Sequence, residues 1–500
     1  MIRNDVGKGA IYLYIQLISS MVSGFIFFIL LARITTTEII GTFSFLVSIS
    51  EIFANIAIIG LPDTIQKFVG RSFLQYKQAD AKTYLKISFV ILAVGITVSC
   101  AMILFLRDWF SGIFGIGFSL IVVVDLLIAS YAIYTILYSI VVASLKTKII
   151  PIIVIISSIA KVFLALSLIL MGHGILGLTL GYTLFGQVVS SALLGIFIIK
   201  IFKSQVKFVK PTVTFRTGYK SILTAGIVAW IPVLITTVGI DLGTLVLYNT
   251  YGPYQSGVYF IALVIANAIN AIVYSIFTIS LPVLSSMQDG RKRFLWQTIR
   301  IGAIIALPLS SSILFYSSDI MQLIGSSYEK GSSPLQFLLL STFPIIILTG
   351  VETLVFSYGQ YRNTMIINLA TSIPRTILYF ALVPIFGMNG VAISYTIGSV
   401  IGFIISLKVA KRIHLLLFWK PIVMTLILPL SLAFVFSTLH VNYVIGIVST
   451  IIVTYLILMK LHVIEKRDGS FFVELMPDKV SKSLITVCGK IEKIIDWFYD

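Results

Sequence analysis

Two basic residues, Lys161 and Arg375, lie alone near the middle of long apolar stretches, at 149–171 and 364–384. A charge at the centre of a bilayer costs about 2.5–3.5 kcal/mol on insertion scales, so such residues usually face a polar cavity or a partner. An ammonium and a guanidinium that face each other across a cavity form a cationic site suited to phosphate or pyrophosphate. The sequence therefore predicts a substrate-binding site that contains Lys161 and Arg375.

Acidic residues offer a different role for the two cations. At a helical rise of about 1.5 Å per residue, Asp125 lies at a depth that allows an ion pair with Lys161. Glu352 lies at a depth that allows one with Arg375. Internal salt bridges and substrate binding are therefore alternative roles for the two cations. Glu352 is itself a candidate substrate-binding residue.

Further polar residues lie within predicted helices. Glu51 and Asn55 share one helix, and Asn267 and Asn270 lie at similar positions of another. These four side chains either line a substrate cavity or bond across helices. Asp241 stands alone among threonines near the outer end of its helix, where a carboxylate suits Na+ or a proton. It is the candidate coupling-ion residue, and simple exposure at a cavity mouth is the alternative.

Signatures of enzymes and of bound metals are missing from the sequence. There is no GxxxxGK[ST] phosphate loop, and none of the four histidines is grouped with other metal-ligand residues. No long outer loop carries a carboxylate pair for acid–base chemistry. We therefore expect neither enzymatic activity nor a cofactor, apart from coupling by Na+ or H+.

The elements that must position these residues are membrane helices. Hydrophobic residues make up 58% of the 500 positions and charged residues 11%, and the mean hydropathy is +1.06. Stretches of about 20 apolar residues, each long enough to span a bilayer, occur at 10–32, 39–61, 84–106, 118–142, 149–171, 175–199, 222–247, 258–281, 301–324, 334–357, 364–384, 389–408, 416–437 and 440–459. The predicted fold class is an all-α polytopic membrane protein with about 14 transmembrane helices.

An internal repeat organises these helices. Residues 157–183 and 371–396 follow nearly the same pattern, and a further match joins 41–43 to 257–259. The matched pairs are Lys161 and Arg375, Gly177 and Gly390, Tyr182 and Tyr395, and Gly41 and Gly257. Because six spans is an even number, the two halves should be parallel six-helix repeats, an N-lobe and a C-lobe around a central cavity. Two extra C-terminal helices fall outside the repeat.

The basic residues indicate how the chain is oriented. With the N-terminus in the cytoplasm, 31 of the 36 Lys and Arg residues fall in cytoplasmic segments and three fall outside. This bias predicts a multi-pass protein of the cell (plasma) membrane with both termini cytoplasmic. The net charge of +17 then reflects orientation and contact with anionic membrane lipids rather than nucleic-acid binding.

The same loops set the expected domain boundaries. The predicted segments are an N-lobe at 1–199, a basic cytoplasmic linker at 200–221, a C-lobe at 222–408, the two extra helices at 409–459 and a cytoplasmic tail at 460–500. Apolar residues at helical spacing between 480 and 498 predict an amphipathic helix in the tail. Such a helix lies either on the inner membrane surface or against the protein's own base.

Two segments resemble a known family. Residues 27–71, with the preceding Gly7-Lys8-Gly9-Ala10, are similar to the first two helices of the Wzx-type polysaccharide biosynthesis flippases of the multidrug/oligosaccharidyl-lipid/polysaccharide superfamily. Residues 358–402, with a Phe-Gly-x-x-Gly turn at 386–390, are similar to their eleventh and twelfth helices. The resemblance covers about residues 1–410.

The resemblance implies a substrate and a mechanism. A polyprenyl-(pyro)phosphate-linked oligosaccharide would move from the inner to the outer leaflet by alternating access, for cell-surface polysaccharide or glycan assembly. The implied partners are this lipid-linked oligosaccharide, membrane lipids, and glycosyltransferases or a polymerase of the same pathway, with the chain itself a monomer. The alternatives are a cation-coupled multidrug or small-molecule antiporter of the same superfamily, a polytopic glycan-assembly membrane enzyme, and a non-transporting scaffold.

Overall fold

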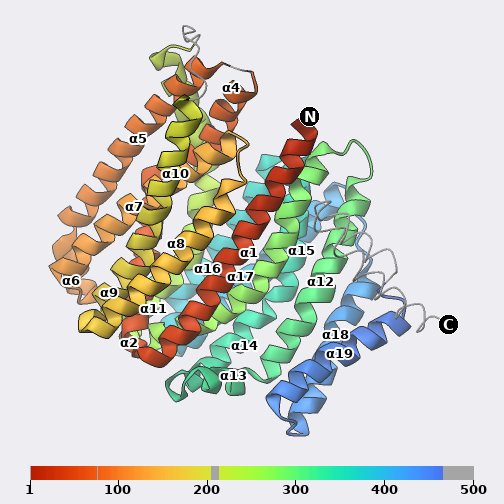
Figure 1. The fold of residues 1–500 in the computed structure, drawn as a ribbon. Helices are drawn as coiled ribbons and strands as arrows, with labels where there is room; N and C mark the ends of the chain where they lie inside the picture. Colours follow the sequence, from red (N-terminus) through yellow and green to blue (C-terminus); the bar gives the residue numbers. More distant parts are fainter. Residues whose placement is uncertain (1, 76, 204–212, 465–500) are drawn as a thin grey trace. The chain divides into compact units, whose positions relative to one another are not determined.

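The computed structural model describes residues 2–75, 77–203 and 213–464, and every regular element in these ranges is a helix (Figure 1). The chain divides into two compact units. Unit 1 holds Met1–Phe27 and Ile34–Phe260, and unit 2 holds Phe28–Arg33 and Ile261–Asp500. Two helices, α1 and α11, contribute residues to both units.

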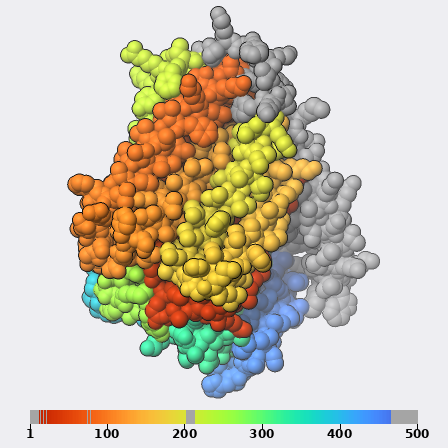
Figure 2. Space-filling model, turned by 60° about the vertical axis from the view of Figure 1, so that its left-hand side comes forward, coloured from red at the N-terminus to blue at the C-terminus, as the bar shows by residue number. Residues whose placement is uncertain are grey.

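Unit 1 is built mainly from the first half of the chain. Its helices are α1 (Ile2–Ile34), α2 (Thr37–Ile58), α3 (Leu61–Thr64), η1 (Ile65–Val69), α4 (Gly70–Leu74), α5 (Gln78–Phe105), α6 (Arg107–Phe114), α7 (Phe118–Ala143), α8 (Ile149–Leu168), η2 (Ile169–His173), α9 (Gly174–Leu178), η3 (Thr179–Leu184), α10 (Phe185–Lys203) and the first part of α11 (Phe215–Ser286). The turns η1, η2 and η3 are π-helical. Figure 2 shows α8 and α10 side by side on one face of this unit.

Unit 2 is built from the remaining helices. They are the end of α11, α12 (Arg291–Phe315), α13 (Ser317–Ile324), η4 (Ser326–Gly331), α14 (Ser332–Leu340), α15 (Thr342–Ser357), α16 (Tyr361–Phe386), α17 (Met388–Arg412), α18 (Trp419–Thr438) and α19 (Tyr443–Lys460). The two C-terminal helices pack against each other and against α12 (Figure 1). The Asn442 side chain caps α19 by accepting a hydrogen bond from the Val444 N–H at 3.0 Å.

The apolar helices match the predicted spans. Eleven helical segments of the described chain are long and apolar enough to cross a membrane, and two of them, Ile149–Ile201 and Phe215–Ser285, run for 53 and 71 residues. About 20 residues suffice for one crossing, so each of these two is long enough for two. With α1, the helices correspond to the predicted stretches, and the prediction of an all-helical chain with about 14 spans is confirmed.

Glycine sets the bend in the longest helix. Gly252 in α11 has φ 78° and ψ −174°, a backbone conformation that only glycine adopts without strain. It lies between the predicted spans 222–247 and 258–281. The bend therefore separates two spans that hydropathy already distinguishes.

The repeat has a steric basis at Gly177 and Gly390. A Cβ atom at Gly177 would lie 2.9 Å from the backbone carbon of Leu168, and one at Gly390 would lie 2.4 Å from the Leu382 carbonyl oxygen. In both halves a glycine therefore lets the last helix of the repeat begin directly against the end of the preceding one. A side chain at either position would force the two helices apart.

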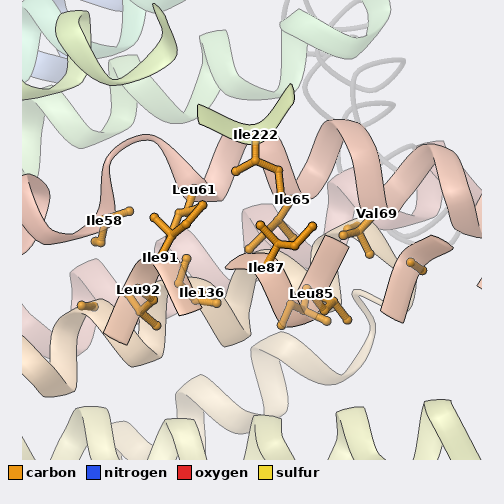
Figure 3. Packing of buried hydrophobic residues seen from close by; sticks show 14 residues of the cluster. Ile58, Leu61, Ile65, Val69, Leu85, Ile87, Ile91, Leu92, Ile136 and Ile222 are labelled. Carbon is orange, nitrogen blue, oxygen red and sulfur yellow. The ribbon is translucent and has the colours of Figure 1, made fainter. Parts of the chain in front are cut away.

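An aliphatic core holds several helices of unit 1 together. Ile58, Leu61, Ile65, Ile136 and Ile222 belong to one buried cluster (Figure 3). These residues come from α2, α3, η1, α7 and α11. The first part of α11 therefore packs into unit 1, although the predicted lobe boundary at 200–221 precedes it in sequence. Residues 204–212 of the predicted linker and 465–500 of the tail, with its amphipathic helix, lie outside the described residues.

Candidate functional site

Lys161 lies on α8 and contacts an aromatic ring of the neighbouring π-helical turn. Its Nζ atom is 4.3 Å from the ring centroid of Tyr182 on η3, within the range of a cation–π interaction. The Tyr182 ring also stacks on Phe27 of α1, with centroids 4.2 Å apart and planes 9° apart. The Lys161 side chain is half-buried, so its charge rests on an aromatic face that α1 supports.

Arg375 lies on α16 and makes the corresponding contact in unit 2. Its guanidinium carbon is 3.9 Å from the ring centroid of Tyr395 on α17. Nη2 donates to the Ser399 Oγ atom at 3.0 Å and reaches the Tyr395 carbonyl oxygen at 3.5 Å. The side chain is 4% exposed, and its Nε–H has no hydrogen-bond partner.

The two arrangements are related by the internal repeat. The sequence comparison matches Lys161 to Arg375 and Tyr182 to Tyr395, and the structure places each cation over its matched tyrosine. We call each such contact a cation–tyrosine pair. The tyrosines were visible in the sequence as repeat positions, but their role as partners of the cations was not predicted.

The ion pairs considered from the sequence do not form in the described part of the chain. Asp125 receives the Cys100 thiol on its backbone carbonyl oxygen at 3.8 Å, and its Oδ1 atom is buried without a hydrogen-bond partner. The Glu352 carboxylate lies near the Asn368 side chain of α16. Neither carboxylate comes within ion-pair distance of the cation in its unit, so the internal salt-bridge explanation is wrong.

A second polar group in unit 1 brings α2 and α11 together. The Ser48 hydroxyl donates to the Asp241 carboxylate at 3.1 Å. Glu51 lies one turn from Ser48, close enough to Asp241 for the two carboxylates to interact electrostatically. The expectation that Asp241 stands alone was therefore wrong. The prediction that it serves a coupling ion stays a prediction.

Asn55 and Trp230 extend this group. The Asn55 side-chain amide donates to the backbone carbonyl oxygen of Glu51 at 2.9 Å. The Trp230 indole N–H donates to the backbone carbonyl oxygen of Asn55 at 2.7 Å. Tyr131 of α7 interacts electrostatically with both Glu51 and Asp241. Neither Tyr131 nor Trp230 was predicted, because no local pattern in α7 or α11 marks them out.

The two asparagines of α11 have different environments in unit 2. Asn270 is buried and accepts a hydrogen bond from the Thr342 hydroxyl at 3.2 Å, so it bonds across helices. Asn267 is exposed. Tyr274, one turn beyond Asn270, is 40% exposed and interacts with Arg375, Glu352 and Tyr395. Sequence reasoning missed Tyr274, which brings α11 to the Arg375 group.

The predicted site residues thus fall into separate groups. Unit 1 holds Lys161 with Tyr182, and Glu51 with Asp241, whereas unit 2 holds Arg375 with Glu352 nearby. The prediction that Lys161 and Arg375 face each other stays a prediction. Among the described residues, neither Lys161 nor Arg375 forms an ion pair with a carboxylate, so each positive charge is available to attract an anion.

Comparisons with known proteins give the fold and the family. The chain resembles the solved structure of the lipid II flippase MurJ in an inward closed conformation, with a TM-score of 0.61, 18% identity and coverage of 85% of this chain and 96% of that one. It also resembles an inward-facing multidrug resistance MATE family transporter of the MOP superfamily, with a TM-score of 0.55, 16% identity and coverage of 80% and 94%. At these identities the likeness establishes the fold, that of a multi-pass membrane protein.

Sequence comparisons are more specific. The probable flippase AglR of Haloferax volcanii is 24% identical over 237 residues, which cover 46% of this chain and 48% of the relative. The chain thus spans about half the length of the curated relative it matches. The profile of one protein family matches residues 6–288, more than half of the 500 residues. The chain belongs to the polysaccharide biosynthesis protein family.

Proposed function

We propose that this protein is a flippase that moves a polyprenyl-(pyro)phosphate-linked oligosaccharide from the inner to the outer leaflet. Membership of the polysaccharide biosynthesis family and likeness to a lipid II flippase fold support this function. Alternating access between two repeats would expose the polar headgroup to each side in turn. The product would feed the assembly of a cell-surface polysaccharide or glycan.

The observation that carries the proposal is a pair of cations that form no ion pair within the part of the chain that the structure describes. Lys161 and Arg375 contact tyrosine rings rather than carboxylates. A buried cation without a counter-ion is costly, and a phosphate oxygen would supply the missing charge with strong hydrogen bonds. We infer that these residues bind the phosphate group of the substrate.

The polar residues around the cations have proposed roles in binding the rest of the headgroup. Asn55 in unit 1, and Glu352 and Asn267 in unit 2, offer amide and carboxylate groups that suit sugar hydroxyls, whereas Glu51 belongs with Asp241. Asn270 already bonds to Thr342, so we assign it to helix packing and only indirectly to binding. No step in this scheme makes or breaks a covalent bond, so we infer a transporter rather than an enzyme.

Coupling to an ion gradient is a separate proposal. Asp241 and Glu51 are two interacting carboxylates, and Ser48 adds a hydroxyl. Two like charges held together favour binding of a proton or Na+ between them. We propose that this group binds the coupling ion and that the protein needs no other cofactor.

Location and partners follow from the same scheme. The distribution of Lys and Arg supports a cell-membrane protein with both termini in the cytoplasm, where it would receive the lipid-linked oligosaccharide. Glycosyltransferases and a polymerase of the same pathway would act before and after it. We propose that a monomer suffices, because both repeats belong to one chain.

Multidrug antiport is the main alternative, because a MATE family transporter shares the fold. A cationic drug would need anionic or aromatic groups at its binding site and would be repelled by Lys161 and Arg375. The two cations therefore favour an anionic substrate. The carboxylates Glu51 and Asp241 fit ion coupling in either kind of transporter and do not distinguish them.

The test is the leaflet distribution of lipid-linked oligosaccharide in cells depleted of this protein. A membrane-impermeant reagent labels only the outer leaflet, and mass spectrometry identifies the labelled lipid. We expect the complete glycolipid to accumulate in the inner leaflet and to return outside on expression of the wild type. Normal sidedness in depleted cells would contradict the proposal.

A matched pair of variants links this function to the cations. Arg375→Gln removes the charge from α16, whereas Arg362→Gln removes an exposed charge from the start of the same helix. Hydrogen bonds to a charged group contribute about 1.5–3 kcal/mol, so Arg375→Gln should lower the outward rate about tenfold or more. Arg362→Gln should restore normal sidedness.

A further inference from the structure

Each half of the repeat pairs its cation with a tyrosine of the next membrane span in the chain. Lys161 of α8 lies over Tyr182, and Arg375 of α16 lies over Tyr395. We propose that Tyr182 and Tyr395 are positioning residues that hold the two cations charged, unpaired and oriented for the phosphate of the substrate. This inference rests on the proposed function and adds two residues to its binding site.

The choice of an aromatic partner has an electrostatic consequence. A carboxylate within 4 Å would stabilise a cation in the membrane but would also cancel its charge. The face of a tyrosine ring attracts the cation through its quadrupole and carries no net charge. A cation on such a face keeps its attraction for an anion. The tyrosine thereby lowers the cost of holding the charge in the apolar region without competing with a phosphate.

The hydrogen bonds of Arg375 leave donors available. Nη2 is directed toward Ser399 and the Tyr395 carbonyl oxygen, and Ser399 in turn donates to that carbonyl oxygen at 2.9 Å. These contacts fix the plane of the guanidinium. Nε–H remains buried without a partner, and an unsatisfied buried donor destabilises the folded state. An anion oxygen within reach of the guanidinium edge would remove that cost.

A glycine in the last helix of each half lets the aliphatic part of the Lys161 or Arg375 side chain lie close to that helix. A Cβ atom at Gly186 would lie 3.2 Å from Lys161 Cβ and 3.1 Å from Cδ. A Cβ atom at Gly398 would lie 2.8 Å from Arg375 Cβ. Gly186 follows Tyr182 by four residues and Gly398 follows Tyr395 by three, so each glycine lies one turn past its tyrosine.

The two halves provide an internal comparison. They differ in the cation, which is lysine in one and arginine in the other, and in the nearby acids Asp125 and Glu352. They share the aromatic face under the cation and the adjacent glycine. The contact with a tyrosine ring is therefore kept although the cation differs between the two halves.

The experiment is a double-mutant cycle on the full-length protein in detergent micelles. The probe is undecaprenyl diphosphate, and the dissociation constant is measured by microscale thermophoresis. Tyr395→Leu removes a desolvated cation–π contact and should weaken binding by about tenfold or more. Tyr395→Phe keeps the ring face and should stay within about twofold of the wild type. In an Arg375→Gln background, Tyr395→Leu should change the dissociation constant less than about twofold.

If Tyr395→Leu fails to fold, the same double-mutant cycle is made with Lys161→Gln and Tyr182→Leu. Both of these side chains are half-buried, so their substitution disturbs packing less. Tyr361→Leu is the matched control, because Tyr361 is an exposed tyrosine on the helix of Arg375. It should leave probe binding unchanged.

The outcomes separate this inference from the proposed function. The inference is overturned if Tyr→Leu weakens diphosphate binding equally with and without the cation. It is also overturned if Tyr→Phe weakens binding as much as Tyr→Leu does, or if the wild type binds no diphosphate. If the cycle shows no coupling but depleted cells retain glycolipid in the inner leaflet, the inference fails and the flippase stands. If the cycle shows coupling and sidedness is normal, the cation–tyrosine pairs stand and the flippase fails.

Discussion

Gly41 and Gly257, which occupy equivalent positions of the internal repeat, lie against each other in unit 1. A Cβ atom at Gly41 would lie 2.8 Å from the Gly257 nitrogen, and one at Gly257 would lie 3.0 Å from the Gly41 nitrogen. A Cβ atom at Gly257 would also collide with the Thr37 carbonyl oxygen. The backbones of α2 and α11 therefore touch here, an approach that small residues permit in membrane helices.

Substitution at this contact should destabilise unit 1. Gly41→Val would place a side chain into the backbone of α11, and overpacking of this kind costs about 1–3 kcal/mol. We expect a lower midpoint of thermal unfolding, measured in detergent by fluorescence-detected size-exclusion chromatography. Gly195→Val on α10 is the control, since no atom lies within 4 Å of a Cβ placed there. Equal midpoints for the two variants would contradict the contact.

The two cations should differ in their tolerance of exchange. Arg375→Lys loses the planar group that reaches Ser399 and Tyr395 together, and lysine does not reproduce that geometry. The lost charged hydrogen bond is worth about 1.5–3 kcal/mol, so outward transport should fall about tenfold. Lys161→Arg keeps a positive charge that can lie over the Tyr182 ring, as the lysine does in the structure. Lys161→Arg should therefore retain transport within about threefold of the wild type. If Lys161→Arg lost more transport than Arg375→Lys, the contacts of the two cations would be misassigned.

Asp125 should be dispensable for holding Lys161. The carboxylate is not paired with the lysine, so Asp125→Asn should leave outward transport within about twofold of the wild type. Removal of one partner of a true buried ion pair typically costs about 3–5 kcal/mol. Transport is measured by outer-leaflet labelling, with Lys161→Gln as the positive control for loss. A loss in Asp125→Asn as large as in Lys161→Gln would restore the salt-bridge explanation.

The carboxylates of α2 and α11 should affect energy coupling rather than substrate binding. Asp241→Asn or Glu51→Gln removes one of two interacting charges. In proteoliposomes, transport driven by an imposed proton or Na+ gradient should be lost, whereas transport down the substrate gradient should continue. Glu38→Gln, an exposed carboxylate on the same helix as Glu51, is the control. Gradient-driven transport that survives in both variants would rule out this group as the coupling site.

Much of the fold could be predicted from the sequence, because its signals are local. A run of about 20 apolar residues has few alternatives to a membrane helix, and each predicted run became one. The glycines Gly177 and Gly390 marked the repeat, since a close helix approach excludes every larger residue there. The presence of Lys161 and Arg375 in apolar runs was likewise evident from sequence, and it required that each cation find a partner.

Only the tertiary structure decided which partner each cation has. A carboxylate on another helix and an aromatic face on the next span both satisfy a membrane cation, and hydropathy does not distinguish them. In the described residues neither Asp125 nor Glu352 forms an ion pair with a cation, whereas Tyr182 and Tyr395 lie under the two charges. Ser48 and Asp241 meet although 193 residues separate them, and Tyr274 of α11 lies close enough to Arg375 of α16 to interact with it electrostatically. Such contacts depend on how helices pack and rotate against one another, and no local pattern of residues encodes that rotation.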